Sequence, residues 1–259
     1  MAENLNLSGV RRRKIAELVK ERGSVTVHDL SDRFGKSEAT IRRDLRELGK
    51  QGVVTRTHGG VMINSRVMAD LPNEERKLVA AEEKRRIGLS AIEMLSGDEV
   101  VFLDAGTTAL CIAENAHQKP DCRYVTTSLG IARQLKARDI RSFFAIGGSY
   151  QSVNDSFAGM IAISALRSLS FDVAFLCCSA VDIEHRSIAI GDEAYSQVQK
   201  EAIASSRRNV VVAHEDKFSA NAFIRTARFD EIDGIVTNRE LDDDTVARLS
   251  STGLEVILA

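Results

Sequence analysis

The sequence predicts an α/β fold in two parts, a small helical unit followed by a larger, mainly parallel α/β domain. Up to about residue 60, apolar residues recur at helical spacing, whereas the rest alternates short apolar strands with helical stretches. The charge divides in the same way. Residues 1–60 carry 13 Lys and Arg against 8 Asp and Glu, a net of +5, and the remainder carries 22 against 29, a net of −7. This asymmetry indicates that the first part meets a polyanion, although a solvated basic face is the alternative.

The composition narrows the class of protein. At 259 residues, with 44% hydrophobic and 28% charged residues, the chain suits two globular domains. No apolar run reaches the roughly 18 residues that span a bilayer, and the first residues lack the apolar stretch of a signal peptide, so a cytoplasmic location is expected. No motif calls for a metal or a cofactor. The cysteines lack C-x-x-C spacing and are expected to be reduced and mostly buried: Cys111, Cys122, Cys177 and Cys178.

Two short helices joined by a tight turn are predicted near the N-terminus. Residues 11–22 carry apolar side chains at helical spacing, and Gly23 is suited to end that helix. Thr26 is a good N-cap for a second helix over residues 27–34, and Gly35 suits the left-handed turn that follows. This arrangement is typical of a helix-turn-helix unit.

A third helix is predicted from the N-cap Ser37 to about Lys50, with one apolar stripe and one basic face. Its apolar stripe consists of Ile41, Leu45 and Leu48, which lie within about 40° of one another around the helix axis. Guanidinium groups on the opposite side bind phosphates or guanine edges, and a small residue allows close approach to the DNA groove. The expected DNA-contacting residues of this helix are Ser37, Ala39, Thr40, Arg42, Arg43 and Arg46.

A short β-hairpin is predicted directly after the third helix, over residues 52–60. Val53 and Val54 are flanked by glycines, and Arg56 and His58 are expected at or near the tip. A helix-turn-helix followed by a basic hairpin is a winged helix, whose positive charge meets DNA phosphates. Residues 1–60 are therefore predicted to form a winged helix-turn-helix DNA-binding domain.

The segment 11–60 resembles the N-terminal domain of the DeoR family of bacterial sugar-metabolism transcriptional regulators. The runs SEATIRRDL and RTHGG carry the resemblance, and Lys36 departs from it, since the family more often has an apolar residue there. The resemblance implies a transcription factor that binds a double-stranded DNA operator and represses a carbohydrate-utilisation operon. Because one winged helix covers a single half-site, a homo-oligomer, dimer or tetramer, is expected.

A linker is predicted over residues 61–73, which contain Pro72, and the second domain is expected to occupy residues 74–259. That domain is expected to begin with one helix over residues 74–95, rich in strong helix formers. Its EEKRRI run is expected to be a solvated face. The alternative is that Lys84 reaches a ligand pocket.

The second domain then alternates strands and helices, which predicts a mainly parallel sheet covered on both faces. Such sheets bind ligands at the carboxyl ends of their strands. The predicted helices are 107–117, 129–137 and 193–206, and the predicted strands are 99–105, 122–128, 141–149, 171–182, 208–216 and 233–238.

Three predicted strands end in residues suited to an anionic ligand. After the strand at 99–105 come Gly106, Thr107 and Thr108, whose amides and hydroxyls at a helix N-terminus suit a phosphate. Threonine is also a common N-cap, so this signal alone is weak. The next strand ends in Thr126, Thr127 and Ser128 before a helix, and the third in Gly147 and Gly148, where backbone can approach a ligand closely. Together they favour a small anionic ligand.

The family resemblance continues through the runs LDAGTT, TTSLGIA, GGSY, GDEAYSQVQKEAI and HEDKF. They are similar to the family's effector domain, which resembles ribose-5-phosphate isomerase in fold and binds phosphorylated sugars. The resemblance implies a phosphate held by Gly106, Thr107 and Thr108, a sugar pocket lined by Thr127, Ser128 and Leu129, positive charge from Lys200 and Lys217, and sugar hydroxyls accepted by Asp104, Asp192 and Glu193. The sequence departs from the family pattern in two places: the family usually has Asn in place of Thr127, and it often has glycines around Cys177, Cys178 and Ala180.

An enzyme is the alternative function. A sugar-phosphate isomerase carrying a DNA-binding arm needs a carboxylate base and a lysine around its substrate, and Asp104, Glu193 and Lys217 offer those groups. Lys217 can equally be an ordinary surface lysine, and Asp216 a turn residue. The complete DNA-binding module favours the regulator.

Overall fold

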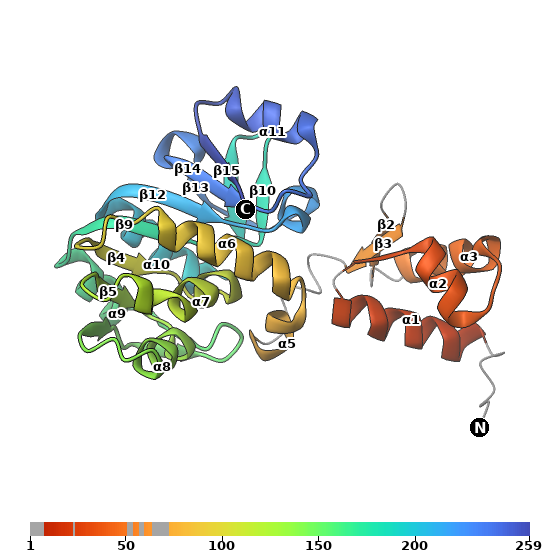
Figure 1. Cartoon of the computed structure of the whole chain (residues 1–259), viewed down its shortest axis with the longest axis horizontal. Coiled ribbons are helices and arrows are strands. Elements are labelled where there is room, and N and C mark those ends of the chain that lie inside the picture. The colour runs from red at the N-terminus through yellow and green to blue at the C-terminus, as the bar shows by residue number, and fades with distance from the viewer. Residues whose placement is uncertain (1–7, 23, 51–53, 57–59, 64–72) are drawn as a thin grey trace. The chain divides into compact units, whose positions relative to one another are not determined.

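The computed structural model describes residues 8–22, 24–50, 54–56, 60–63 and 73–259 of the chain (Figure 1). The chain divides into two compact units, Met1–Ala80 and Ala81–Ala259. The division falls after Ala80, later than the predicted linker.

The N-terminal unit contains the predicted three helices and hairpin. Helices α2 and α3 pack against each other, and the hairpin β2–β3 is antiparallel. A further strand, β1, pairs with β3 and was not predicted, because three residues are too short to show alternation. The elements are α1 (Ser8–Arg22), β1 (Ser24–Thr26), α2 (Val27–Phe34), α3 (Glu38–Lys50), β2 (Val54–Arg56), β3 (Gly60–Ile63) and α5 (Asn73–Leu78).

The predicted caps and the apolar stripe of this unit are confirmed. The Thr26 hydroxyl accepts a hydrogen bond from the Asp29 amide at 3.1 Å, and Gly35 adopts φ 59°, the left-handed conformation that suits glycine. Ile41, Leu45 and Leu48 are buried in the core of the unit. The turn and the third helix therefore follow from local sequence rules.

The predicted single helix over residues 74–95 is wrong, because the chain forms two helices there. Helix α5 ends at Leu78, and α6 (Ala81–Glu93) begins after Ala80, which has φ 50°. Val79 between them is buried in the core of the N-terminal unit, so this burial outweighs the local helix propensity. The predicted linker also begins inside a strand, since Val61 of β3 is buried. Residues 64–72 lie outside the described part of the chain.

The C-terminal unit is built on a parallel sheet, as predicted. Within residues 81–259, all of which the structure describes, the sheet has seven strands in the order β15-β14-β12-β9-β4-β5-β6, and every neighbouring pair is parallel. The strands are β4 (Val100–Leu103), β5 (Arg123–Thr126), β6 (Phe143–Ala145), β9 (Phe171–Leu176), β12 (Ser206–Val212), β14 (Gly234–Thr237) and β15 (Glu255–Leu258).

Two small antiparallel sheets accompany the parallel one. Strands β7 (Ser149–Gln151) and β8 (Ser156–Ala158) form a hairpin, and β10 (Ala180–Asp182), β11 (Ser187–Ile190) and β13 (Ile224–Arg228) form a separate sheet. The sequence indicated neither sheet as such, because strands of three to five residues between turns carry little periodicity.

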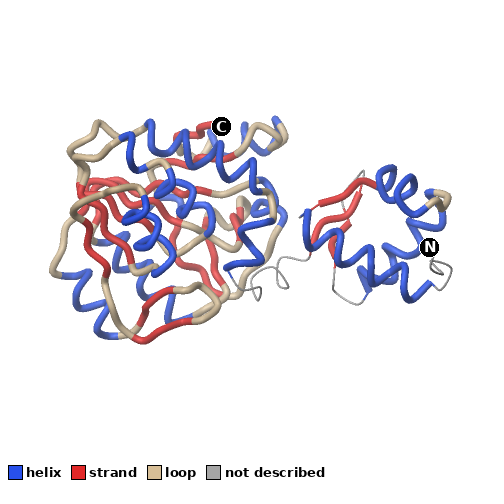
Figure 2. Tube along the Cα trace, turned by 60° about the horizontal axis from the view of Figure 1, so that its bottom comes forward, coloured by secondary structure: helices blue, strands red, loops and turns tan. Residues whose placement is uncertain are grey.

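Helices cover both faces of the parallel sheet (Figures 1 and 2). Val101 and Leu103 of β4 pack with α6, α7 (Thr107–Glu114) and α8 (Leu129–Ala137). Phe102 between them faces the other core, with α9 (Met160–Arg167), α10 (Glu193–Ala204) and α11 (Asp243–Ser250). Both faces of the strand are therefore apolar, as a buried parallel sheet requires. Three short 3₁₀ turns complete the described elements of this unit: Ala116–Gln118, Glu215–Ser219 (η2) and Phe229–Glu231.

The strand order reverses direction between β4 and β9. From β4 the chain proceeds to β5 and β6 on one side, and from β9 to β12, β14 and β15 on the other. In sheets of this type the crevice outside the carboxyl ends at such a reversal is where ligands bind.

Gly88 allows α6 and α7 to approach closely. A Cβ atom at this position would lie 2.6 Å from the carbonyl carbon of Cys111, which is backbone and cannot swing away. We expect Gly88→Ala to lower the free energy of unfolding by about 1 to 3 kcal/mol. Urea unfolding followed by tyrosine fluorescence measures this change, because Tyr124, Tyr150 and Tyr195 all lie in the C-terminal unit and the chain has no tryptophan.

The matched control is Gly147→Ala, since a Cβ atom there would meet nothing within 4 Å. It should change stability by no more than about 0.5 kcal/mol. Equal effects of the two substitutions would contradict the close-packing explanation.

Within the described parts of the chain, none of the helices combines the length and the apolar character that crossing a membrane requires.

Candidate functional site

The outer face of α3 carries the predicted basic residues. Arg42, Arg43 and Arg46 are exposed, as is Ala39, while Thr40 is half-buried. Arg42 forms an ion pair with Glu38 one turn earlier, with Nη2 and Oε2 3.1 Å apart. Exposed pairs of this kind contribute only about 0.5 kcal/mol, so the guanidinium can exchange this partner for a phosphate or a base.

The N-terminus of α3 is fixed by Ser37, whose hydroxyl lies 3.4 Å from the Thr40 amide and 3.0 Å from the Thr40 hydroxyl. A buried ion pair between Arg11 Nε and Asp44 Oδ2, 2.6 Å apart, ties α3 to α1. Sequence reasoning missed this pair, because the two residues are far apart along the chain. Helix α3 is thus fixed at its N-terminus by Ser37 and on its buried side by the ion pair between Arg11 and Asp44.

The two hairpin residues expected to contact DNA are only partly covered. Arg56 is the last residue of β2, and its backbone pairs with Val61 of β3. The Arg56 side chain and His58 lie outside the described residues.

The candidate ligand site of the C-terminal unit lies at the carboxyl edge of the parallel sheet. Because the strands are parallel, the segments that follow β4, β5, β6, β9 and β12 all open on this edge. They bring together residues that are far apart in sequence. The predicted site residues on these segments are Asp104, Gly106, Thr107, Thr108, Thr127, Ser128, Leu129, Gly147, Gly148 and Lys217.

Asp104 lies at the centre of this edge as a buried structural carboxylate. It is 0% exposed, and among the described residues it accepts hydrogen bonds from four donors. These are the amide of Ala105 at 2.9 Å, the amide of Cys177 at 2.8 Å, Nε2 of Gln199 at 2.7 Å and the hydroxyl of Tyr195. Burial raises the pKa of Asp104, and these hydrogen bonds act in the opposite direction.

The role of Asp104 as an acceptor of sugar hydroxyls stays a prediction, and its burial argues against it. Both carboxylate oxygens already have protein donors, and neither reaches solvent. Its function in the fold is to join β4 to β9 and α10. The two α10 partners, Tyr195 and Gln199, were missed, although their i, i+4 spacing puts them on one side of a helix.

The N-terminus of α7 differs from those of α8 and α10. Helix α8 is capped by its own Ser128, which accepts from the Ile131 amide at 3.3 Å. Helix α10 is capped by Asp192, which accepts from the Tyr195 amide at 2.7 Å. Helix α7 follows Gly106, which has no side chain to cap the first amides. Its N-terminus is therefore chemically suited to an outside anion.

Thr107 and Thr108 form the first turn of α7 and are both buried. Gly106 is needed directly before them, because a Cβ atom there would lie 2.7 Å from Cβ of Cys177. Cys177 thus packs against the turn that presents these amides.

The predicted sugar pocket after β5 is partly filled by the chain itself. The Leu129 amide donates to the Asp155 carbonyl at 2.9 Å, and the Phe157 amide donates to the Thr127 carbonyl at 2.9 Å. The Leu129 amide is thus taken by the segment that joins β7 to β8, and Ser128 is occupied as a cap. The Thr127 hydroxyl is buried and has no partner among the described residues.

Gly147 and Gly148 follow β6, and only Gly147 has free space around the position of a side chain. A Cβ atom on Gly148 would lie 2.5 Å from the carbonyl oxygen of Ala158, so the close approach expected there is to β8. Gly147 is exposed with nothing nearby.

The predicted residues of α10 lie mostly in solvent. Asp192 and Glu193 are exposed at its start, and Lys200 is exposed farther along. Lys200 comes one residue after Gln199, so it points about 100° away from the side of α10 that meets Asp104. The residue of this motif that reaches the centre of the edge is Gln199.

Lys217 lies in η2, which begins three residues after the end of β12, and is half-buried. Its positive charge and the negative charge of Asp104 both act on the Cys178 thiol, whose pKa burial raises to about 12. Lys217 therefore lies near the β4–β9 reversal. All four cysteines are free; Cys111 and Cys122 are buried, whereas the other two are half-buried.

Two further residues lie near this edge of the sheet. No role was predicted from the sequence for His214, and a solvated position was predicted for Lys84. Lys84 in α6 is 3% exposed, so its expected place on a solvated face is wrong. His214, two residues after β12, is fully buried. Burial and the nearby charges of Lys217 and Lys84 hold the pKa of His214 well below its usual value, so the imidazole is neutral.

The neighbouring acidic and amide groups tie α6 to the sheet. Arg86 of α6 donates to Glu240 at 2.7 Å, and Glu240 accepts from Asn238 at 2.8 Å. Asn238 also donates to Glu215. This chain of contacts holds the start of α6, and hence Lys84, against the ends of β12 and β14.

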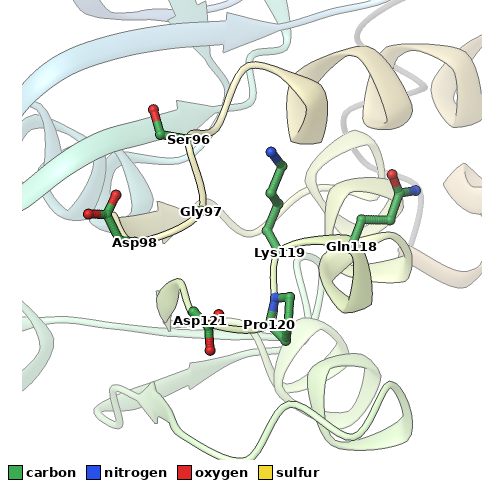
Figure 3. A pocket seen from close by; sticks show the side chains of 7 residues that line it. All are labelled: Ser96, Gly97, Asp98, Gln118, Lys119, Pro120 and Asp121. Atoms are coloured by element: carbon green, nitrogen blue, oxygen red, sulfur yellow. The ribbon is translucent and has the colours of Figure 1, made fainter.

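A pocket lies at the opposite edge of the sheet (Figure 3). Its residues precede β4 and β5, so it opens at the amino ends of these strands. The structure brings none of the predicted site residues into it. It is lined by Ser96, Gly97, Asp98, Gln118, Lys119, Pro120 and Asp121.

Comparison with known families and proteins agrees with this architecture. The family model described as "DeoR-like helix-turn-helix domain" matches residues 11–67, and "DeoR C terminal sensor domain" matches residues 79–239. The transcriptional repressor AccR of Agrobacterium fabrum is 32% identical over 228 residues, 88% of each chain. The regulator GlpR of Haloferax volcanii is 32% identical over 251 residues, covering 97% of this chain and 98% of its own.

More distant likenesses were also found. The glycerol-3-phosphate regulon repressor of Escherichia coli is 29% identical and covers 88% of this chain and 90% of its own. Among solved structures, ribose 5-phosphate isomerase A of Methanocaldococcus jannaschii aligns with a TM-score of 0.41 at 15% identity, over 54% of this chain and 55% of that one.

Proposed function

Because the chain belongs to the DeoR family of transcriptional regulators, we propose that it is a cytoplasmic repressor of a carbohydrate-utilisation operon. Its α3 face binds operator DNA, and a phosphorylated sugar at the carboxyl edge of the C-terminal unit changes its DNA affinity. Linkage of this kind typically amounts to about 1 to 3 kcal/mol.

The observation that carries the ligand proposal is the uncapped N-terminus of α7. The amides and hydroxyls of Thr107 and Thr108 suit a phosphate, and the helix dipole adds to the attraction. Lys217 supplies positive charge near the same strand ends. One relative is named after glycerol-3-phosphate, itself a phosphorylated polyol, which supports this ligand class.

The DNA proposal rests on the exposed arginines of α3. Arg43 and Arg46 are exposed, so their guanidinium groups can meet phosphates and bases. A homodimer or tetramer is proposed, because a single recognition helix covers one half-site. Sedimentation at micromolar concentration, with and without operator DNA, tests this assembly, and a monomer in both conditions would rule it out.

The enzyme alternative has less support. An isomerase needs a carboxylate that can reach the substrate, and Asp104 is buried with both oxygens engaged. Glu193 remains as an exposed carboxylate at the start of α10. Turnover assays with pentose and hexose phosphates test the alternative directly, and sustained isomerisation would overturn the regulator-only proposal.

A thermal-shift screen with phosphorylated sugars and their unphosphorylated counterparts tests the ligand class. A ligand at a hundredfold excess over its Kd adds about 2.7 kcal/mol to the stability of the folded state. The phosphorylated compounds should stabilise the protein and the free sugars should not. Equal stabilisation by both would contradict a phosphate site.

We expect Thr108→Val to weaken binding of the best phosphorylated sugar by about 1 to 3 kcal/mol, because the substitution keeps the shape and removes a hydroxyl donor. DNA affinity without the ligand should stay near that of the wild type, while the response to the ligand should be lost. Calorimetric titration gives the first value, and DNA-binding assays with and without the sugar phosphate give the second.

The matched control is Thr245→Val, which alters a threonine in the first turn of α11. That helix is capped by Asp242 and has acidic residues in its first turn, so it is unsuited to an anion. A similar loss of ligand binding in both variants would argue against the α7 site.

A further inference from the structure

His214, two residues after β12, is a buried imidazole without a hydrogen-bond partner in the part of the chain that the structure describes. His214 is 0% exposed, and neither Nδ1 nor Nε2 has a hydrogen-bond partner among the described residues. Oδ2 of Asp216 lies 3.6 Å from Nδ1, which is too far for a hydrogen bond. The backbone is fixed, since the His214 carbonyl accepts from the Lys217 amide at 3.0 Å. Buried polar atoms without partners are rare and call for an explanation.

The surroundings of His214 are rich in positive charge. Lys84 from α6 and Lys217 from η2 both act on it, and Asp216 is the acidic group beside it. The same two lysines act on Asp216, together with the opposing charge of Glu83. An anionic molecule here would meet two cations and a neutral ring.

The neutral imidazole offers one N–H donor and one acceptor nitrogen. A phosphate dianion offers only acceptors, so it can satisfy only the N–H. Hydroxyl groups donate and accept, so a carbon chain with hydroxyls can satisfy both nitrogens. An apolar ligand would satisfy neither. The chemistry therefore selects a polyhydroxylated anion.

We infer that His214 contacts the ligand of the C-terminal unit through hydroxyl groups on its carbon chain, while Lys84 and Lys217 balance its negative charge. This inference rests on the proposed function, which places the phosphate at α7. It adds a residue that distinguishes ligands by their hydroxyls. The run HEDKF begins with His214, but neither the strand-end pattern nor the family resemblance gave this residue a role.

The test compares His214→Leu with the wild-type full chain by calorimetric titration. The probes are the sugar phosphate that stabilises the wild type most, its deoxy analogues, and inorganic phosphate. We expect His214→Leu to bind the sugar phosphate at least tenfold more weakly and inorganic phosphate equally well. A deoxy analogue that lacks the contacted hydroxyl should bind both proteins alike. The control is His117→Leu, an exposed histidine, which should bind like the wild type.

The outcomes separate this inference from the proposed function. If the wild type binds a sugar phosphate and His214→Leu binds it equally well, the inference is wrong and the proposed function stands. If the wild type binds no sugar phosphate, both are wrong. Should the variant fail to fold, the imidazole ¹⁵N signals of the wild type decide. Of its five histidines, only His214 should shift on adding the sugar phosphate, and an unchanged His214 signal would refute the contact.

Discussion

Replacing Asp104 with alanine is expected to lower the free energy of unfolding of the C-terminal unit by about 3 to 5 kcal/mol. The substitution leaves the Cys177 amide and the Tyr195 hydroxyl buried without their acceptor, and Gln199 Nε2 keeps only the Cys177 carbonyl. Each unsatisfied group costs about 1 to 3 kcal/mol, and the cavity adds to this. Because these donors come from β9 and α10, the junction of three elements should loosen together.

Urea unfolding followed by tyrosine fluorescence measures this effect, since the tyrosines report on the C-terminal unit alone. Asp121→Ala is the control, because Asp121 is exposed at the opposite edge of the sheet and should change stability by less than about 0.5 kcal/mol. A loss below 1 kcal/mol for Asp104→Ala would mean that the buried hydrogen bonds contribute little.

The double substitution Arg42→Ala and Arg43→Ala is expected to weaken operator binding by about 2 to 6 kcal/mol, if each arginine contributes the 1 to 3 kcal/mol of a base contact. Both side chains are exposed on the outer face of α3, near its N-terminal end. Arg46 lies one turn farther along. Arg46→Ala should therefore weaken binding uniformly across sequences and reduce the salt slope by about 1, as loss of a phosphate contact does.

An operator selected from a random duplex library serves for the measurement, with unrelated DNA as the comparison. Base reading requires that the Arg42 and Arg43 substitutions reduce affinity for the operator more than for unrelated DNA. Equal losses on both would leave only phosphate contacts. Arg138→Ala, an exposed arginine of the C-terminal unit, is the control and should leave DNA affinity unchanged.

The parts of the fold that could be predicted are those governed by neighbouring residues. The stripe of Ile41, Leu45 and Leu48, the Thr26 cap and the Gly35 turn each need only a few adjacent positions, and the structure confirms them. The parallel sheet followed from apolar strands that alternate with helices, and it too is confirmed. Local rules were sufficient because they act in the same direction as the tertiary packing.

The parts that could not be predicted depend on distant packing. The break at Ala80 arises because Val79 is buried in the N-terminal core, although the local sequence favours one continuous helix. Lys84 is surrounded by polar residues in sequence and is nevertheless buried. Charge patterning alone gives no sign of such a position, because it cannot show what packs above it.

In the candidate site too, features set by neighbouring residues could be predicted, whereas features set by distant residues could not. The Gly106-Thr107-Thr108 turn was recognisable from the sequence, because the chemistry of a helix N-terminus is local. The role of Asp104 was not, since its partner Gln199 lies 95 residues away. Nor could the sequence show that the Leu129 amide is taken by Asp155, which belongs to an unpredicted hairpin.

Gly106 and Cys177 fill one shared space, since any side-chain atom added at the first would overlap the second. The two positions are therefore not free to drift independently during evolution. A larger residue at position 106 is acceptable only after position 177 has lost its side chain, and a reversal must follow the opposite order. In this chain the side chain stands on the β9 side of that space, which commits the turn before α7 to glycine for as long as the cysteine remains.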